Sequence, residues 1–374
     1  MHDGLAPLCT LRLAPLAPLI ALRPRAPRDS LAATTRASTP GKRIMVTHAR
    51  LRLAALAFAA ALALVGLVAP PAAVAQPAPR ISVSSLTLPV FNPIVWNIMK
   101  ARGFDARHGF ELDIKPYPSI SAFYAAFATG ETDVLIGGPT ILQKLYQEGV
   151  QLQIFATGFT LSDLVIFAKD DKIKSLADLK GKQLAADMGG SQFQVIKIYA
   201  NAKGIDLGKD ITVINANFAI ARAQLEADRV EAALIIEPLA SITLKQNPGW
   251  NVIFNGAQGW REIAGQDGWE IVAAMRSDAI KRVPGGPKAL MAALQDVANV
   301  LHNESDAADK IAADTVKLPP GILKAAVDGK RLHMIVRPAW EPETRKSIVD
   351  MMERAVQAGF YPKSPDEKII YAPQ

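Results

Sequence analysis

The chain has 374 residues, a length that allows two domains of ordinary size, and its formal net charge is +7. The charge lies at the start, because residues 1–75 hold nine of the 42 Lys and Arg but two of the 35 Asp and Glu. The remainder carries 33 residues of each sign, which argues against nucleic-acid binding, since a phosphate backbone requires a clustered basic face.

Residues 45–75 have the pattern of a signal peptide. Arg50 and Arg52 precede an apolar run of about 17 residues at 53–69, which two prolines then break. The segment Ala73-Val74-Ala75 supplies the small residues that a signal peptidase requires. A transmembrane anchor is the alternative, but the run is at the lower limit of a spanning helix and is rich in Ala. We therefore expect cleavage and export.

The residues on either side of this segment add to that expectation. Residues 1–44 show no helical or strand periodicity, and we interpret them as sequence upstream of a start at Met45 or as a disordered extension. Cys9, the only cysteine, lies there, so the mature chain would have no thiol chemistry. Gln76 rather than Cys follows the cleavage point, which predicts a periplasmic protein without a lipid anchor.

From residue 81 onward, short apolar strands alternate with helices. The first series consists of expected strands at 81–84, 111–114, 134–136 and 152–155, with helices at 92–102, 119–129 and 139–148. Asn92 is expected to cap its helix, because Pro93 suits the first helical position. Repeated strand–helix–strand units favour an α/β fold with mostly parallel sheets and helices on both faces.

A second series follows with the same alternation. It begins after an extended segment at 164–167 and consists of strands at 183–185, 211–214, 233–236 and 252–254, and helices at 175–180, 191–203, 218–228 and from 237 onward. The helix at 175–180 should begin with a capping box formed by Ser175 and Asp178. The strand at 252–254 is expected to be the last, and residues 287–374 are expected to be mainly helical. No repeat of 20–50 residues is visible.

Several short motifs occur along these two series in a specific order. They are Gly103-Phe104 with Gly109-Phe110, the step Thr129 to Val134, the turn Gly137-Gly138-Pro139-Thr140, the run Ser175-Leu176-Ala177-Asp178-Leu179-Lys180-Gly181, and Glu237-Pro238. In this order they resemble type II periplasmic binding proteins of the group that handles nitrate, taurine, aliphatic sulfonates and thiamine-pyrimidine precursors.

The resemblance implies a fold of two α/β lobes with a ligand cleft between them. The expected first lobe takes residues 76–168 and is completed by 271–374, and the second lobe takes 169–270. Two crossover segments, near Phe167 and Ile271, would form the hinge. The implied partners are a small-molecule solute and the permease and ATPase of an ABC transporter, with the binding protein itself a monomer.

Candidate ligand-binding residues lie in the loops that follow the strands, where open α/β sheets bind ligands. They are Leu88, Phe91, Asn92, Gly138, Thr140, Gly190, Ser191, Gln192, Asn217, Phe218 and Glu237. Ser191 follows two glycines at a helix start, where free N–H groups favour an anion, but it could equally be an ordinary cap. Asn92 and Asn217 have the same alternative, and Glu237 could bind the ligand or fix the hinge.

Met188 occupies a turn in which several relatives that bind strong anions carry a basic residue. This difference favours a neutral, aromatic or weakly charged solute. No metal or cofactor is expected, because His108, His302 and His333 have no partner at metal-ligand spacing, and no phosphate-binding or nucleophile motif occurs.

Two other functions remain open from the sequence. A thiamine-pyrimidine synthase-like enzyme would share the fold, although the export signal and the cysteine-free mature chain argue against it. A periplasmic sensor that binds a solute for a membrane receptor would share both the fold and the location.

Overall fold

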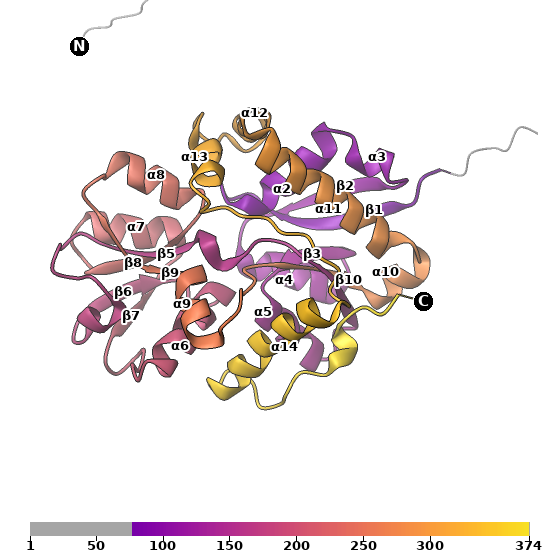
Figure 1. Cartoon of the computed structure of the whole chain (residues 1–374). Coiled ribbons are helices and arrows are strands. Elements are labelled where there is room, and N and C mark those ends of the chain that lie inside the picture. The colour runs from indigo at the N-terminus through magenta and orange to yellow at the C-terminus, as the bar shows by residue number, and fades with distance from the viewer. Residues whose placement is uncertain (1–76, 374) are drawn as a thin grey trace, which may run out of the picture. The chain divides into compact units, whose positions relative to one another are not determined.

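The computed structural model describes residues 77–373 of the chain. The expectations for residues 1–44 and for the signal peptide at 45–75 lie outside these residues. The described part contains two five-stranded mixed sheets with helices on both faces, as Figure 1 shows. We refer to the units built on the two sheets as the first lobe and the second lobe.

The first lobe has the strand order β2-β1-β3-β10-β4. The strands are β1 (Arg80–Leu86), β2 (Glu111–Tyr117), β3 (Val134–Gly137), β4 (Leu152–Thr157) and β10 (Val272–Arg276). β1 pairs parallel with β2 and β3, whereas β10 runs antiparallel between β3 and β4. The expectation of mostly parallel sheets is confirmed, with one reversed strand in each.

Four helices of the first lobe lie within residues 91–147. They are α2 (Phe91–Ala101), α3 (Phe104–Arg107), α4 (Ile120–Thr129) and α5 (Pro139–Gln147). The hydroxyl of Ser119 accepts a hydrogen bond from the Ala122 N–H at 3.2 Å, and Gly130 ends α4 at φ 84°. Asn92 does not cap α2, which corrects the expectation: the cap position is Val90, and the Asn92 side chain instead reaches back to Leu86.

The second lobe has the order β7-β6-β8-β5-β9. The strands are β5 (Leu164–Ala168), β6 (Gln183–Ala186), β7 (Thr212–Asn215), β8 (Ala232–Ile236) and β9 (Asn251–Asn255). Its helices are α6 (Ser191–Ala202), α7 (Phe218–Glu226), α8 (Leu239–Gln246) and α9 (Gly256–Ala264). The capping box is confirmed, and it opens a 3-10 turn, η3 (Leu176–Leu179).

Two strands lie where the sequence analysis did not expect them. β5 is hydrogen-bonded between β8 and β9, so the chain enters the second sheet before Leu164 and not after residue 168. β10 was not expected as a strand, because Ile271 was assigned to the hinge and β9 was taken as the last strand. Each sheet thus receives its antiparallel strand from a segment that has just crossed between the lobes.

A third segment accompanies the two crossovers at the hinge. The first crossover passes through η2 (Leu161–Asp163). Beside it, the Thr157 N–H donates to the Arg337 carbonyl and the Thr160 N–H donates to the His333 carbonyl, each at 3.0 Å. Since the Gly158 N–H also bonds to the Ile271 carbonyl at 3.1 Å, the hinge contains three adjacent chain segments where two were expected.

The C-terminal part is mainly helical, as expected. Its elements are α10 (Ser277–Arg282), α11 (Gly286–Asn303), α12 (Ser305–Val316), α13 (Ile322–Asp328), α14 (Pro342–Gln357) and η4 (Glu367–Ile369). α11 and α12 pack on α2, and α14 packs on both α5 and α6. Across residues 77–373, every helix falls short of the length and hydrophobicity needed to span a bilayer.

Candidate ligand-binding cleft

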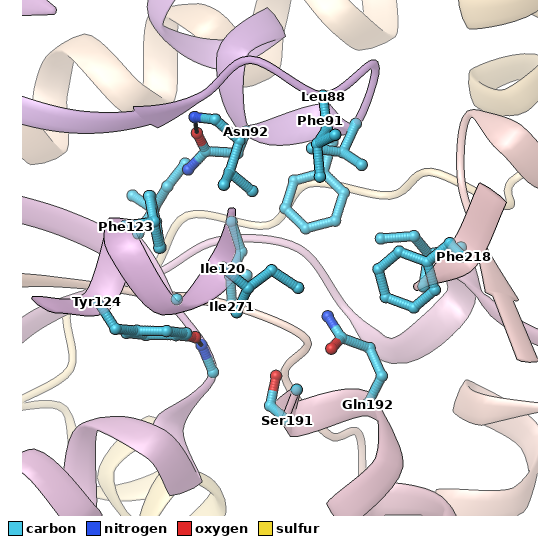
Figure 2. A pocket seen from close by; sticks show the side chains of 17 residues that line it. Leu88, Phe91, Asn92, Ile120, Phe123, Tyr124, Ser191, Gln192, Phe218 and Ile271 are labelled. Carbon is cyan, nitrogen blue, oxygen red and sulfur yellow. Dashed lines mark hydrogen bonds between the residues drawn. The ribbon is translucent and has the colours of Figure 1, made fainter. Parts of the chain in front are cut away.

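A pocket lies where loops of the two lobes face each other (Figure 2), and about 510 Å³ of space there, part of it open to solvent, is unfilled by protein atoms. Eight of the predicted ligand-binding residues line it. From the first lobe these are Leu88, Phe91, Asn92 and Gly138, and from the second lobe Gly190, Ser191, Gln192 and Phe218. The loops that follow the strands therefore meet at one place.

The residues that the sequence analysis missed are mostly apolar. They are Leu86, Val90, Ile120, Phe123, Tyr124, Ile136, Gly137, Ile236 and Ile271. Polar groups at helix starts can be recognised in a sequence, whereas most apolar residues at strand ends carry no comparable signal. The position of Tyr124, one turn after Ile120 on α4, was the available sign that this helix also faces the cleft.

A second hollow, with about 870 Å³ of space, continues the first and shares Leu88, Val90, Ile120, Phe218 and Ile236 with it. It extends the cleft to Ser119, Ser121, Asp187, Gly189 and Asn217, among others. The predicted residue Asn217 lies here, and its side-chain oxygen accepts from the Ile220 N–H at 3.0 Å. Asn217 thus caps α7 at the edge of the cleft.

The remaining two predicted residues line neither hollow. The Thr140 hydroxyl is buried, with no hydrogen-bond partner among the described residues. The Glu237 carboxylate is fully buried, 2.8 Å from the guanidinium of Arg331, and accepts from the N–H and hydroxyl of Ser241 at 3.0 Å each. Because Arg331 begins the third hinge segment, this geometry favours the hinge role for Glu237.

The two lobes touch at Gly138 and Ser191, next to the starts of α5 and α6. A Cβ placed on Gly138 would lie 2.2 Å from the Ser191 Cβ and 2.3 Å from its Oγ. The lobes can therefore approach this closely only because residue 138 has no side chain.

Four polar side chains line the pocket, namely Asn92, Tyr124, Ser191 and Gln192, and three of them make hydrogen bonds within the protein. Asn92 Oδ1 accepts from the Leu86 N–H at 3.0 Å, and its Nδ2 has no partner among the described residues. The Tyr124 hydroxyl accepts from the Gly138 N–H at 3.2 Å, and burial raises the pKa of its phenol far above the usual range. Gln192 Nε2 donates to the Glu270 carboxylate.

Three buried carboxyl groups, which we call the hinge carboxyl cluster, come together at the crossovers: Asp163, Glu237 and Glu270. Burial raises the pKa of Glu270 to about 7. Burial, and then the neighbouring carboxylates of Glu270 and Glu237, raises the pKa of Asp163 well above its usual range. Both Asp163 oxygens and Glu270 Oε2 lack hydrogen-bond partners among residues 77–373.

Within the described part of the chain, there is no group of three or more His, Cys, Asp or Glu side chains arranged to hold an ion. The site therefore consists of apolar walls, a few polar atoms and two helix starts.

Residues 93–304, more than half of the chain, match the model of the family described as NMT1/THI5 like. The chain belongs to this family. The resemblance inferred from the order of the motifs is thereby confirmed. No curated protein matches the chain by sequence.

Solved structures of two kinds of periplasmic protein share the fold of this NMT1/THI5-like chain. The aliphatic sulphonate binding protein SsuA from Escherichia coli has a TM-score of 0.67 at 17% identity, over 80% of this chain and 94% of that one. SsuA from Xanthomonas axonopodis pv. citri, bound to MOPS, has a TM-score of 0.64 at 18% identity, over 78% of this chain and 97% of that one. The nitrate-binding protein NrtA from Synechocystis PCC 6803 has a TM-score of 0.62 at 18% identity, over 77% of this chain and 84% of that one.

Proposed function

We propose that this chain is the periplasmic substrate-binding component of an ABC importer, which captures a small organic solute between its lobes and delivers it to a membrane permease. The observation that carries the proposal is the pocket itself. It is lined by both lobes, and the lobes touch beside it at Gly138 and Ser191. A solute that contacts both lobes would stabilise this closed arrangement, and closure would present a distinct surface to a permease.

Two further observations support the periplasmic role. The neighbours that share the fold are named as periplasmic binding proteins for sulfonates and nitrate. The predicted signal peptide at 45–75, with Gln76 at the cleavage point, provides a route of export without a lipid anchor.

An enzyme on the same fold is the second candidate, and the pocket favours it less. The described residues that line the pocket include no His, Cys, Asp, Glu or Lys, and most are aliphatic or aromatic. The hydroxyl groups of Tyr124 and Ser191 have no basic or acidic partner among these lining residues that could activate them for general acid–base or nucleophilic catalysis. The lining therefore suits binding better than turnover.

Native mass spectrometry tests the proposal directly. The protein is purified from the periplasmic fraction without denaturation, and its mass is measured before and after unfolding in organic solvent. We expect one solute per chain that is released unchanged, and a monomer as the carrier. Release of a chemically altered product on incubation would instead identify an enzyme.

Uptake experiments separate an importer from a sensor. The released solute is supplied in radiolabelled form to cells with and without the gene for this chain. Uptake that depends on the gene supports the importer. Unchanged uptake together with a lost transcriptional response would overturn the proposal in favour of a sensor.

A further inference from the structure

The charges around the cleft point away from an anionic solute. Among the described residues that line the two hollows, none is Lys, Arg or His, and Asp187 alone carries a charge. An anion transferred from water into such a site would lose its hydration without gaining a counter-ion. The starts of α5 and α6 offer only partial positive charge, which by itself replaces neither the counter-ion nor the hydration that an anion would lose.

The hinge carboxyl cluster lies close to the pocket and is rich in acidic groups. Glu270 is held by Gln192, a residue that lines the pocket, and Asp163 and Glu237 lie near Glu270. Arg331, the cation in contact with the cluster, is already occupied by the Glu237 carboxylate at 2.8 Å. Among the described residues, the cluster therefore supplies no unpaired cation that could serve as the counter-ion of an anionic ligand.

The polar atoms of the pocket show which kind of hydrogen bond a solute must make. The Leu86 N–H can only donate, so it fixes the Asn92 amide with Oδ1 toward Leu86. The remaining Asn92 Nδ2 is a buried donor, and it has no partner among residues 77–373. The Tyr124 oxygen already accepts from the Gly138 N–H, which leaves its proton available for donation. Both groups require an acceptor on the solute.

The walls are apolar and come from both lobes. Figure 2 shows the ring of Phe91 from the first lobe and the ring of Phe218 from the second, with Ile120 and Ile271 nearby. Aromatic rings on two sides bury a flat apolar body efficiently.

From these contacts we propose that the solute is an uncharged, largely apolar molecule that presents a hydrogen-bond acceptor to Asn92 and Tyr124. This inference rests on the proposed binding function and names its substrate class. The neighbours named for sulfonate and nitrate binding share the fold of the chain, and this pocket would select against solutes with their charge.

Matched pairs of neutral and anionic small molecules test whether the pocket prefers an uncharged solute. Benzamide is compared with benzoate, and hexanamide with hexanoate and 1-hexanesulfonate, by calorimetric titration at pH 8, where each acid is ionised. We expect at least one amide to bind, with each anion at least tenfold weaker than its neutral counterpart. An anion that binds as tightly as its amide, or failure of both amides to bind, overturns the inference.

A substitution at Asn92 tests whether the solute must present a hydrogen-bond acceptor. Asn92→Asp keeps the oxygen that accepts from Leu86 but replaces the donor with an oxygen, and we expect the affinity for the bound amide to fall at least tenfold. Asn97→Asp is the matched control on the same helix, since the Asn97 amide donates to the Pro93 carbonyl at 2.8 Å and lies outside the lining. We expect it to change the affinity less than twofold. An unchanged or increased affinity in Asn92→Asp overturns the requirement for an acceptor.

The outcomes also distinguish this inference from the proposed function. If the anions bind and the amides do not, the substrate class is wrong and the binding function stands. If no compound binds and the native protein carries no solute, both are wrong.

Discussion

Closure of the cleft depends on the absence of a side chain at Gly138, and Gly138→Ala tests this dependence. The residue has φ −64° and ψ 132°, a conformation that alanine adopts without strain. In the closed arrangement the added methyl group would lie 2.2 Å from the Ser191 Cβ, whereas carbon atoms in contact lie about 3.5–4.0 Å apart. The lobes would have to separate by more than about 1 Å at this point.

The expected penalty is that of an overpacked contact, about 1–3 kcal/mol, and it falls on the closed state alone. This corresponds to a decrease of about 5- to 150-fold in the closed population, and the apparent affinity for any solute that requires closure should fall by the same factor. The melting temperature of the solute-free protein should hardly change.

Ser191→Gly provides the rescue, because both atoms that approach the added methyl group closely belong to the Ser191 side chain. The next atom, the Glu270 carbonyl oxygen, is 3.7 Å away, an ordinary contact. The double variant Gly138→Ala/Ser191→Gly should close again, whereas Gly138→Ala/Ser191→Ala should not, since alanine retains the Cβ.

Spin labels report the separation of the lobes. Cysteines introduced at Ala101 on α2 and Ala223 on α7, both exposed, would be the only cysteines after residue 75. Double electron–electron resonance should show a shift to longer distances in Gly138→Ala and its reversal in the glycine double variant. Identical distance distributions in the wild type and Gly138→Ala would refute the reasoning.

Three further predictions follow from the hinge and from the start of the chain. Glu270 has a pKa of about 7 against an ordinary value near 4.5, so the folded state favours the protonated form and its stability should fall as the pH rises from about 4.5 through 7. Urea unfolding from pH 4.5 to 8 should show this decline in the free energy of unfolding, and the decline should be smaller in Glu270→Gln. An equally steep decline in Glu270→Gln would mean that another group titrates. Arg331→Met should lower the free energy of unfolding by about 3 kcal/mol, the low end for breaking a buried ion pair, because Arg331 is partly exposed. Arg331→Met/Glu237→Gln should recover part of that loss, and no recovery would mean that Arg331 acts through other contacts. The exported protein should begin at Gln76, which N-terminal sequencing checks; a membrane-bound product that retains residues 53–69 would contradict the signal peptide.

The sequence predicted those elements whose signals are local. The helix expected at 119–129 is present as α4, with Ser119 as its cap and Gly130 at its end, and the capping box of Ser175 and Asp178 is present as expected; all of these residues act within one turn of the chain. The start of α2 was misplaced for a related reason. Proline is compatible with several positions in the first turn of a helix, so Pro93 does not fix where α2 begins. The side-chain oxygen of Asn92 accepts from the N–H of Leu86, a strand residue six positions earlier, and does not cap the helix.

Features that depend on distant segments could not be predicted in the same way. β10 is a short buried run, and nothing local distinguishes a strand inserted antiparallel between β3 and β4 from an extended crossover. The hinge carboxyl cluster has the same origin. Asp163 and Glu270 are ordinary acidic residues in the sequence, and they become neighbours only because both crossovers pass through the hinge.

The third segment at the hinge also determines how the lobes can move. The bonds from Thr157 to Arg337 and from Thr160 to His333 make the crossover part of a short ladder. Bending across the ladder keeps these bonds, whereas sliding one segment along another would break them. The opening of the cleft should therefore be a rotation about a single axis, and a chain shortened to end before Arg331 should lose that constraint although its pocket residues all remain.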